Sequence, residues 1–374
     1  MAEAARLFIL AGEPSGDRLG AALVRGLRRR RDIALAGVGG AELEGEGLRP
    51  LYPMSDLSVM GVTDVLKRLP LLVWRARQTV RAILAQRPDL VVLIDAQVFS
   101  ATIARRLRQA GYGGRILLYV APSVWAWKPE RAPALRPLFD EVLAVLPFEP
   151  AVMRRLGGPP TTYVGHPALA TTVPRATQPE RGPLLLLPGS RRGELQRHLP
   201  LMGQVAAALA PHERVSGFVL PTPGHMTKQV RAAVATWAVP VEVTTDAEAK
   251  RRAFAEAVAA AAVIGTVTLE LALSGVPMAI TYVADRGQVM LFSKHRPRFM
   301  GLPNILADAA LVPERLGGEP QPEAVIADIA ALLDDPAAAA RQRAGFARIR
   351  AAMQKGAPDA PLVDPAERVL SYLP

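Results

Sequence analysis

The stretch LVVLI, residues 90–94, is followed directly by Asp95 and decides the fold class. Five consecutive apolar residues, three of them β-branched, predict a strand that is buried on both faces, as in a parallel sheet covered by helices. The carboxyl end of such a strand faces the ligand crevice in a doubly wound sheet, so Asp95 is a candidate general base. Capping of the next helix is the alternative role for its carboxylate.

Apolar runs of strand length alternate with longer amphipathic stretches along the chain, which predicts α/β architecture with parallel sheets. An Ala-rich stretch, 322–353, indicates one or two helices, and a short amphipathic segment follows at 366–373. The other strands expected are 7–11, 33–38, 115–120 and 141–145 in the first half, and 183–187, 216–220, 241–244, 261–264 and 277–282 in the second.

The length of 374 residues suits two domains rather than one core. Residues 168–182 are rich in Thr, Pro, Arg and Gln, which indicates a linker. We therefore expect an N-terminal Rossmann-like domain (1–172), a C-terminal one (173–352) and a final helical segment (353–374). Two such domains in tandem would bring their strand ends together across a cleft.

The net charge of +11, from 45 Lys+Arg against 34 Asp+Glu, favours anionic partners. The basic residues are dispersed and no aromatic residues interleave with them, which argues against nucleic acid as the binding partner. No cysteine is present, and no thiolate metal site is expected. The apolar stretch 257–283 contains Glu270 and Pro277, which predicts buried strands and a helix instead of a membrane span. No signal peptide is recognised, so a cytoplasmic location is expected.

In each half of the chain, a glycine-containing turn follows the first strand. In AGEPSGD (11–17), Glu13, Ser15 and Gly16 could line a ligand site, or the turn is an ordinary one capped by Ser15 or Asp17. In LPGSRRGE (187–194), backbone amides and a guanidinium at a helix start suit a diphosphate. The residues concerned there are Gly189, Ser190 and Arg191; a solvated Arg191 is the alternative.

A third turn, GTVTLE (265–270), leads into another helix. Its hydroxyls and the amide of Gly265 could hold phosphate, and Glu270 could accept both hydroxyls of a ribose. The alternative is an N-capped helix in which Glu270 offsets the helix dipole. The two hydroxyl-bearing candidates are Thr266 and Thr268.

Aromatic residues gather in PSVWAW (122–127), at a predicted strand end. Ser123, Trp125 and Trp127 are candidates for the acceptor side, because indoles can stack on a sugar or line an acyl channel; simple packing is the commoner use of Trp. His166, in VGHP (164–167), is either a hinge residue or a catalytic one.

The segment 57–77 mixes apolar and basic residues, a composition that suits a helix lying in a membrane interface. Met60, Leu71, Leu72 and Trp74 would face the membrane or an acyl chain. A core-facing helix is the alternative.

Taken together, these motifs resemble the lipid-A-disaccharide synthase family. Nine of its signature segments occur in order over nearly the whole chain. They are AGEPSGD (11–17), SVMGVTDVL (58–66), PDLVVLIDA (88–96), PSVWAW (122–127), LPFEP (146–150), VGHP (164–167), LPGSRRGE (187–194), GTVTLELAL (265–273) and LPNILA (302–307).

The resemblance implies a GT-B glycosyltransferase that needs neither a bound metal nor a cofactor. It would transfer 2,3-diacylglucosamine from UDP-2,3-diacylglucosamine to 2,3-diacylglucosamine 1-phosphate at an anionic inner-membrane surface. A homodimer is compatible with the resemblance. By the same resemblance, Asp95 is the general base, the 189–191 turn holds the UDP diphosphate, and Asn304 completes the nucleotide site with Thr266, Thr268 and Glu270.

The sequence departs from the family after Asp95, where Ala-Pro-Asp-Phe-Asn is usual and this chain has Ala96, Gln97, Val98, Phe99 and Ser100. Ile264 also replaces a common serine. Two other functions stay open: a different GT-B enzyme such as a UDP-N-acetylglucosamine 2-epimerase, or a peripheral lipid- or nucleotide-binding protein with weakened catalysis.

Overall fold

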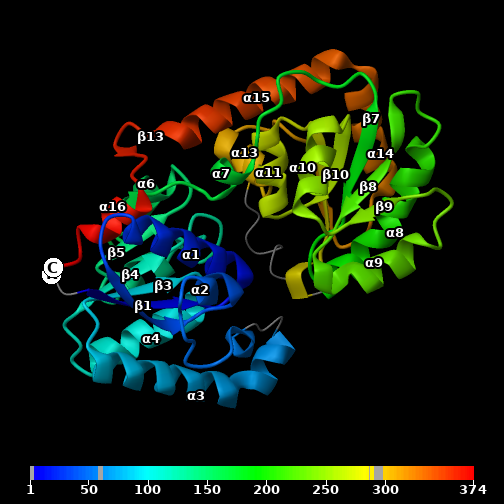
Figure 1. The fold of residues 1–374 in the computed structure, drawn as a ribbon. Helices are drawn as coiled ribbons and strands as arrows, with labels where there is room; N and C mark the ends of the chain where they lie inside the picture. Colours follow the sequence, from blue (N-terminus) through cyan, green and yellow to red (C-terminus); the bar gives the residue numbers. More distant parts are fainter. Residues whose placement is uncertain (1–3, 58–61, 286, 290–297) are drawn as a thin grey trace. The chain divides into compact units, whose positions relative to one another are not determined.

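The computed structural model describes residues 4–57, 62–285, 287–289 and 298–374 (Figure 1). The chain forms two compact units. Unit 1 comprises Met1–Pro167 and Met353–Pro374, and unit 2 comprises Ala168–Ala352. Each unit is built around its own parallel sheet of six strands.

The sheet of unit 1 has the strand order β2-β1-β3-β4-β5-β6. The predicted central strand is β3 (Leu90–Ile94), and all five of its residues are buried. Helices cover both faces: α3 and α4 pack on one face, and α1 packs on the other (Figure 1). The remaining strands are β1 (Ala5–Ala11), β2 (Ile33–Val38), β4 (Arg115–Tyr119), β5 (Glu141–Ala144) and β6 (Thr161–Tyr163), and the helices are α1 (Pro14–Arg28), α2 (Ala41–Gly45), α3 (Val62–Gln86), α4 (Gln97–Gln109), α5 (Arg131–Leu135) and α6 (Glu149–Arg155), with a 3-10 turn at Met54–Asp56.

The C-terminal segment completes unit 1. It forms a small hairpin, β13 (Gly356–Ala357) with β14 (Ala360–Pro361), and the helix α16 (Pro365–Leu370). α16 packs on α1, where a Cβ on Gly26 would lie only 2.9 Å from the Cβ of Ala366. Arg368 of α16 also pairs with the buried carboxylate of Glu141 at 2.8 Å.

The sheet of unit 2 has the order β12-β11-β10-β7-β8-β9. The apolar stretch 257–283 forms β10, α11 and β11, as predicted. The strands are β7 (Gly182–Leu187), β8 (Val215–Pro221), β9 (Glu242–Thr244), β10 (Ala259–Val263), β11 (Met278–Val283) and β12 (Glu314–Gly317), and the helices are α7 (Ala168–Thr171), α8 (Arg192–Leu209), α9 (Thr227–Val234), α10 (Ala247–Glu256), α11 (Thr266–Ser274), α13 (Leu302–Ala307), α14 (Pro322–Asp334) and α15 (Pro336–Lys355, which continues into unit 1), with a 3-10 turn at Gly224–Met226.

Each sheet has one point where the strand order reverses. In unit 1 it lies between β1 and β3, and in unit 2 between β7 and β10. Ligands of open α/β sheets bind outside the carboxyl ends of the strands at this switch point. Four of the turns predicted to carry site residues follow these strands: those at Gly12 and Asp95 in unit 1, and those at Gly189 and Gly265 in unit 2.

Candidate active site

The two turns at the switch point of unit 1 pack tightly against each other. A Cβ on Gly12 would approach the Cβ of Ala96 to 2.8 Å, and one on Gly16 would lie 3.3 Å from Ile94 Cγ2. Any larger side chain at Gly12 would push the turn after β1 away from Asp95. The glycines of AGEPSGD therefore allow this close approach, whatever else they bind.

Asp95 lies in a turn with an unusual backbone. Its φ is 52° and that of Ala96 is 43°, so two successive non-glycine residues adopt the left-handed conformation. The Asp95 amide donates to Tyr119 O at 2.9 Å, which joins the turn to the end of β4. The side chain is half-buried. Left-handed non-glycine residues are strained and gather at functional sites, which supports the choice of Asp95.

The acceptor-side candidates follow β4 in a loop that begins with a third strained residue, Val120, at φ 79°. Ser123 is exposed, and Trp125 and Trp127 are half-buried. The Trp125 ring meets Phe148 edge-on, with centroids 5.4 Å apart. The indoles thus leave part of their surface accessible, as a stacking surface requires.

Glu149 is a buried acid that the sequence reasoning missed. One carboxylate oxygen accepts from the amides of Val145 (3.1 Å) and Leu146 (2.9 Å), and the other accepts from Trp125 Nε1 (3.3 Å). Burial raises the pKa of Glu149 to about 7. Glu149 therefore fixes the loop after β4 to the turn after β5. Its position as the first residue of α6, five residues after the end of β5, was the signal for such a role.

The remaining candidates of unit 1 are Glu13 and Ser15 at the start of α1, and His166 after β6. Glu13 and Ser15 are exposed at the start of α1, and neither caps it through its side chain. Asp17 instead accepts from Gly40 N at 2.8 Å and Glu42 N at 3.0 Å, so it caps α2; the alternative of Ser15 or Asp17 capping their own turn is wrong. Burial lowers the pKa of His166 to about 4, which keeps its imidazole neutral at pH 7.

In unit 2, the turn after β7 leads into α8, and the acidic side chain of Glu194 binds the backbone amides at the start of this helix. Glu194 Oε2 accepts from the amides of Ser190 (3.0 Å) and Arg191 (3.2 Å), and Oε1 lies 3.1 Å from Arg191 Nη1. The carboxylate thus takes the position at the helix start that we predicted for a diphosphate. The Arg191 side chain is 60% exposed, and its guanidinium remains accessible to an anion. Gly189 has φ 101°, which a glycine tolerates best.

The turn after β10 offers fewer groups than its sequence suggests. Thr266 is exposed at the start of α11, after the N-cap Gly265. Thr268 is buried and its hydroxyl donates to Gly265 O at 2.8 Å, so this hydroxyl stabilises the turn. Glu270 pairs with Lys250 of α10, a residue the sequence reasoning did not single out. A partly exposed carboxylate with a lysine beside it suits a ribose and its phosphate.

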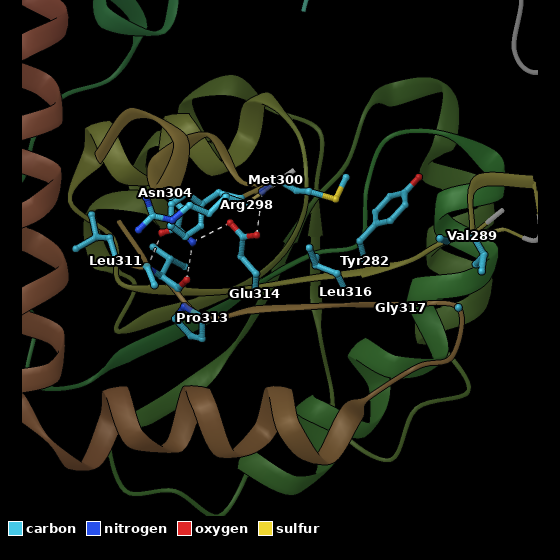
Figure 2. A pocket seen from close by; sticks show the side chains of 15 residues that line it. Tyr282, Val289, Arg298, Met300, Asn304, Leu311, Pro313, Glu314, Leu316 and Gly317 are labelled. Carbon is cyan, nitrogen blue, oxygen red and sulfur yellow. Dashed lines mark hydrogen bonds between the residues drawn. The ribbon is translucent and has the colours of Figure 1, made fainter. Parts of the chain in front are cut away.

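Asn304 lies in a different place from the switch point. Its amide Nδ2 donates to Val312 O (2.8 Å) and Glu314 Oε1 (2.7 Å), and its Oδ1 accepts from Val312 N (2.8 Å). Figure 2 shows Asn304 and Glu314 pointing toward each other in the wall of a pocket of about 940 Å³ along β12. With every amide group bonded within the chain, Asn304 supports the segment before β12 and does not present a free group to a nucleotide.

The membrane-facing candidates fall on α3 or before it. Met60 lies outside the described residues. Leu72 packs against the core of unit 1, which contradicts its predicted membrane role, and Leu71 is half-buried. Trp74 is 53% exposed and Leu69, five residues earlier in α3, is 48% exposed. Within the part of the chain that the structure describes, no helix is long and apolar enough to cross a bilayer.

The architecture is that of the GT-B glycosyltransferases, which have two Rossmann-like domains. A putative UDP-N-acetylglucosamine 2-epimerase from Listeria monocytogenes superposes with a TM-score of 0.62 at 15% identity, over 99% of this chain and 95% of that one. The calicheamicin glycosyltransferase CalG4 gives 0.61 at 19% identity, over 100% and 98%. At these identities the likeness concerns the fold alone.

Sequence comparison identifies the family. The model of the lipid-A-disaccharide synthetase family matches residues 7–361, and the chain belongs to this family. Lipid-A-disaccharide synthases from Rhodopseudomonas palustris (43% identical, 92% of this chain and 90% of that one) and Ruegeria pomeroyi (43%, 89% and 88%) are similar to it. The predicted fold class, family and enzyme class, a UDP-sugar glycosyltransferase, are confirmed. The relatives support the synthase function rather than an epimerase.

Proposed function

We propose that the enzyme transfers 2,3-diacylglucosamine from its UDP derivative to the 6-hydroxyl of 2,3-diacylglucosamine 1-phosphate. The products are the β-1,6-linked disaccharide 1-phosphate and UDP. The observation that carries the proposal is the pairing of family membership with the two switch points: one holds a strained carboxylate, Asp95, and the other holds an exposed guanidinium, Arg191.

The residues divide the reaction between them. Asp95 accepts the proton of the acceptor 6-hydroxyl, and the oxygen attacks the anomeric carbon of the donor from the side opposite UDP. The bond from that carbon to the diphosphate oxygen breaks, and UDP leaves with the electron pair. Arg191 stabilises the charge that develops on the diphosphate, while Glu270 binds the ribose. This single displacement inverts the anomeric carbon.

Both substrates carry acyl chains, and we propose that α3 contacts an anionic membrane surface. The support is the pair of exposed apolar side chains, Leu69 and Trp74, beside Arg68 and Arg77, which are also exposed. Such a combination suits an interfacial helix. Arg75 stacks over the Trp74 ring at 4.1 Å, which orients the indole.

Incubation of the purified protein with both lipid substrates, followed by mass spectrometry, tests the reaction. We expect the disaccharide 1-phosphate and UDP in equal amounts. UDP release without disaccharide would indicate a hydrolase. Epimerisation of UDP-N-acetylglucosamine, with no disaccharide from the lipid pair, would indicate the alternative enzyme.

A further inference from the structure

The three side chains that distinguish the stretch after Asp95 from the usual family sequence have different surroundings. Val98 is 74% exposed and has no structural part in the turn. Gln97 and Ser100, in contrast, both bind backbone atoms of strained residues. These two polar side chains are therefore the ones that matter for the geometry of Asp95.

Ser100 holds the turn from within. It is fully buried, and its Oγ donates to the carbonyl oxygen of Asp95 at 2.8 Å. Its amide donates to the carbonyl oxygen of Ala96 at 2.9 Å. Both left-handed residues thus have their carbonyl groups bonded to the same serine, which fixes the orientation of the two peptide planes.

Gln97 links the turn after β3 to the neighbouring loop after β4. Its Nε2 donates to the carbonyl oxygen of Val120 at 3.0 Å. Val120 is β-branched and left-handed, a conformation that persists only where its surroundings enforce it. The Asp95 amide binds Tyr119 O, one residue earlier. The turn after β3 and the loop after β4 are therefore joined at two neighbouring points.

We propose that Gln97 and Ser100 are positioning residues that hold the carboxylate of Asp95 in its working orientation. The proposal rests on the proposed function, in which Asp95 is the base. A base must lie within hydrogen-bond reach of the proton it removes, and a displacement of about 1 Å can cost 10²-fold in rate. The bond from Ser100 to the Asp95 carbonyl, and the bond from Gln97 to Val120 in the loop after β4, limit such displacement.

The test uses Gln97→Met and Ser100→Ala, each made in the parent and in Asp95→Asn. In the parent, we expect each to lower kcat about three- to tenfold, the effect of one hydrogen bond, with UDP affinity unchanged. In Asp95→Asn, neither should lower the residual rate further, because both act through the missing carboxylate. Thr102→Val is the matched control: it removes a hydroxyl bond to Val98 O on the same helix, away from the turn, and should change nothing.

Gln97→Pro provides a second variant. Residue 97 is the first of α4, where proline is well accepted, so the helix should form without the donor to Val120. A loss equal in both backgrounds, or no loss in the parent, overturns the proposal while leaving Asp95 as base. A parental rate in Asp95→Asn would instead remove the base itself, and the positioning role with it.

Discussion

The two units differ in which residues occupy the left-handed positions in the turns at their strand ends. In unit 1, the turn after β3 and the loop after β4 place Asp95, Ala96 and Val120 at positive φ, where a side chain makes the conformation costly. In unit 2, the turn after β7 has Gly189 at φ 101°, where no side chain is strained. The turn after β3 thus keeps a carboxylate at a strained position, whereas the turn after β7 needs a glycine because a Cβ on residue 189 would lie only 2.6 Å from Glu194 Oε2. We propose that unit 1 supplies the catalytic carboxylate and unit 2 the exposed guanidinium that binds the diphosphate.

Replacement of Asp95 by Asn is expected to have the largest effect. Asn keeps the size and tolerates the left-handed conformation, but it cannot accept the proton. We expect turnover to fall by roughly 10²–10⁴, the range for a removed general base. Single-turnover kinetics with both lipid substrates measures this loss. Turnover within a few-fold of the parent would mean that another group accepts the proton. Unit 1 would then not supply the catalytic carboxylate through Asp95.

Glu149 should make the stability of unit 1 depend on pH. Its pKa in the folded protein, about 7, is raised above the ordinary value of 4.5 because the carboxylate is buried. The folded state therefore binds a proton that the unfolded state releases, and stability falls as pH rises from 4.5 through 7. The parent should lose about 3 kcal/mol more than Glu149→Gln over this range. Denaturant unfolding at both pH values measures the difference, and parallel losses in the two proteins would contradict it.

Glu194 offers a way to sharpen the account of unit 2. Its carboxylate competes with an anion for the amides of Ser190 and Arg191, so Glu194→Gln should raise UDP affinity several-fold. The control is Glu248→Gln, which removes the same charge from an exposed i,i+3 pair of the same unit. A fall in UDP affinity would mean that Glu194 orients Arg191 for the ligand, and does not compete with it.

A separate prediction concerns the membrane surface, which lies at neither switch point. Leu69→Ser with Trp74→Ser should weaken binding to vesicles containing anionic lipid about tenfold, because interfacial affinity follows buried apolar area. UDP affinity and thermal stability should stay at parental values. Val173→Ser, at a 77% exposed position of unit 2, controls for the loss of an exposed apolar group. Equal vesicle binding by all three proteins would exclude α3 as the contact.

The sequence predicted the positions of the turns better than the partners of their side chains. The buried strand β3 was predicted at its observed bounds, and the other predicted strands lie within two residues of theirs, because burial on both faces leaves a continuous hydrophobic signal. β6 (TTY) and β12 (ERLG), at the edges of the sheets, were missed because they are short and polar. Motifs likewise located the turns at Gly265 and Asp95.

Hydrogen-bond partners depend on distances that arise only in the folded chain. Thr268 and Asn304 carry the polar atoms of a ligand site, yet their side chains bond to their own turn and to the segment before β12. Glu149 and Lys250 were missed for the converse reason: their partners, Trp125 and Glu270, lie 24 and 20 residues away in the sequence.

The division of labour between the units is tested most directly by calorimetric titration of UDP into Asp95→Asn and Arg191→Ala. We predict that Asp95→Asn binds UDP with parental affinity, since its change lies in unit 1. Arg191→Ala should bind UDP at least tenfold more weakly, because it loses a charge-assisted contact of about 1.5–3 kcal/mol. Parental affinity in Arg191→Ala, or a tenfold loss in Asp95→Asn, would contradict the account.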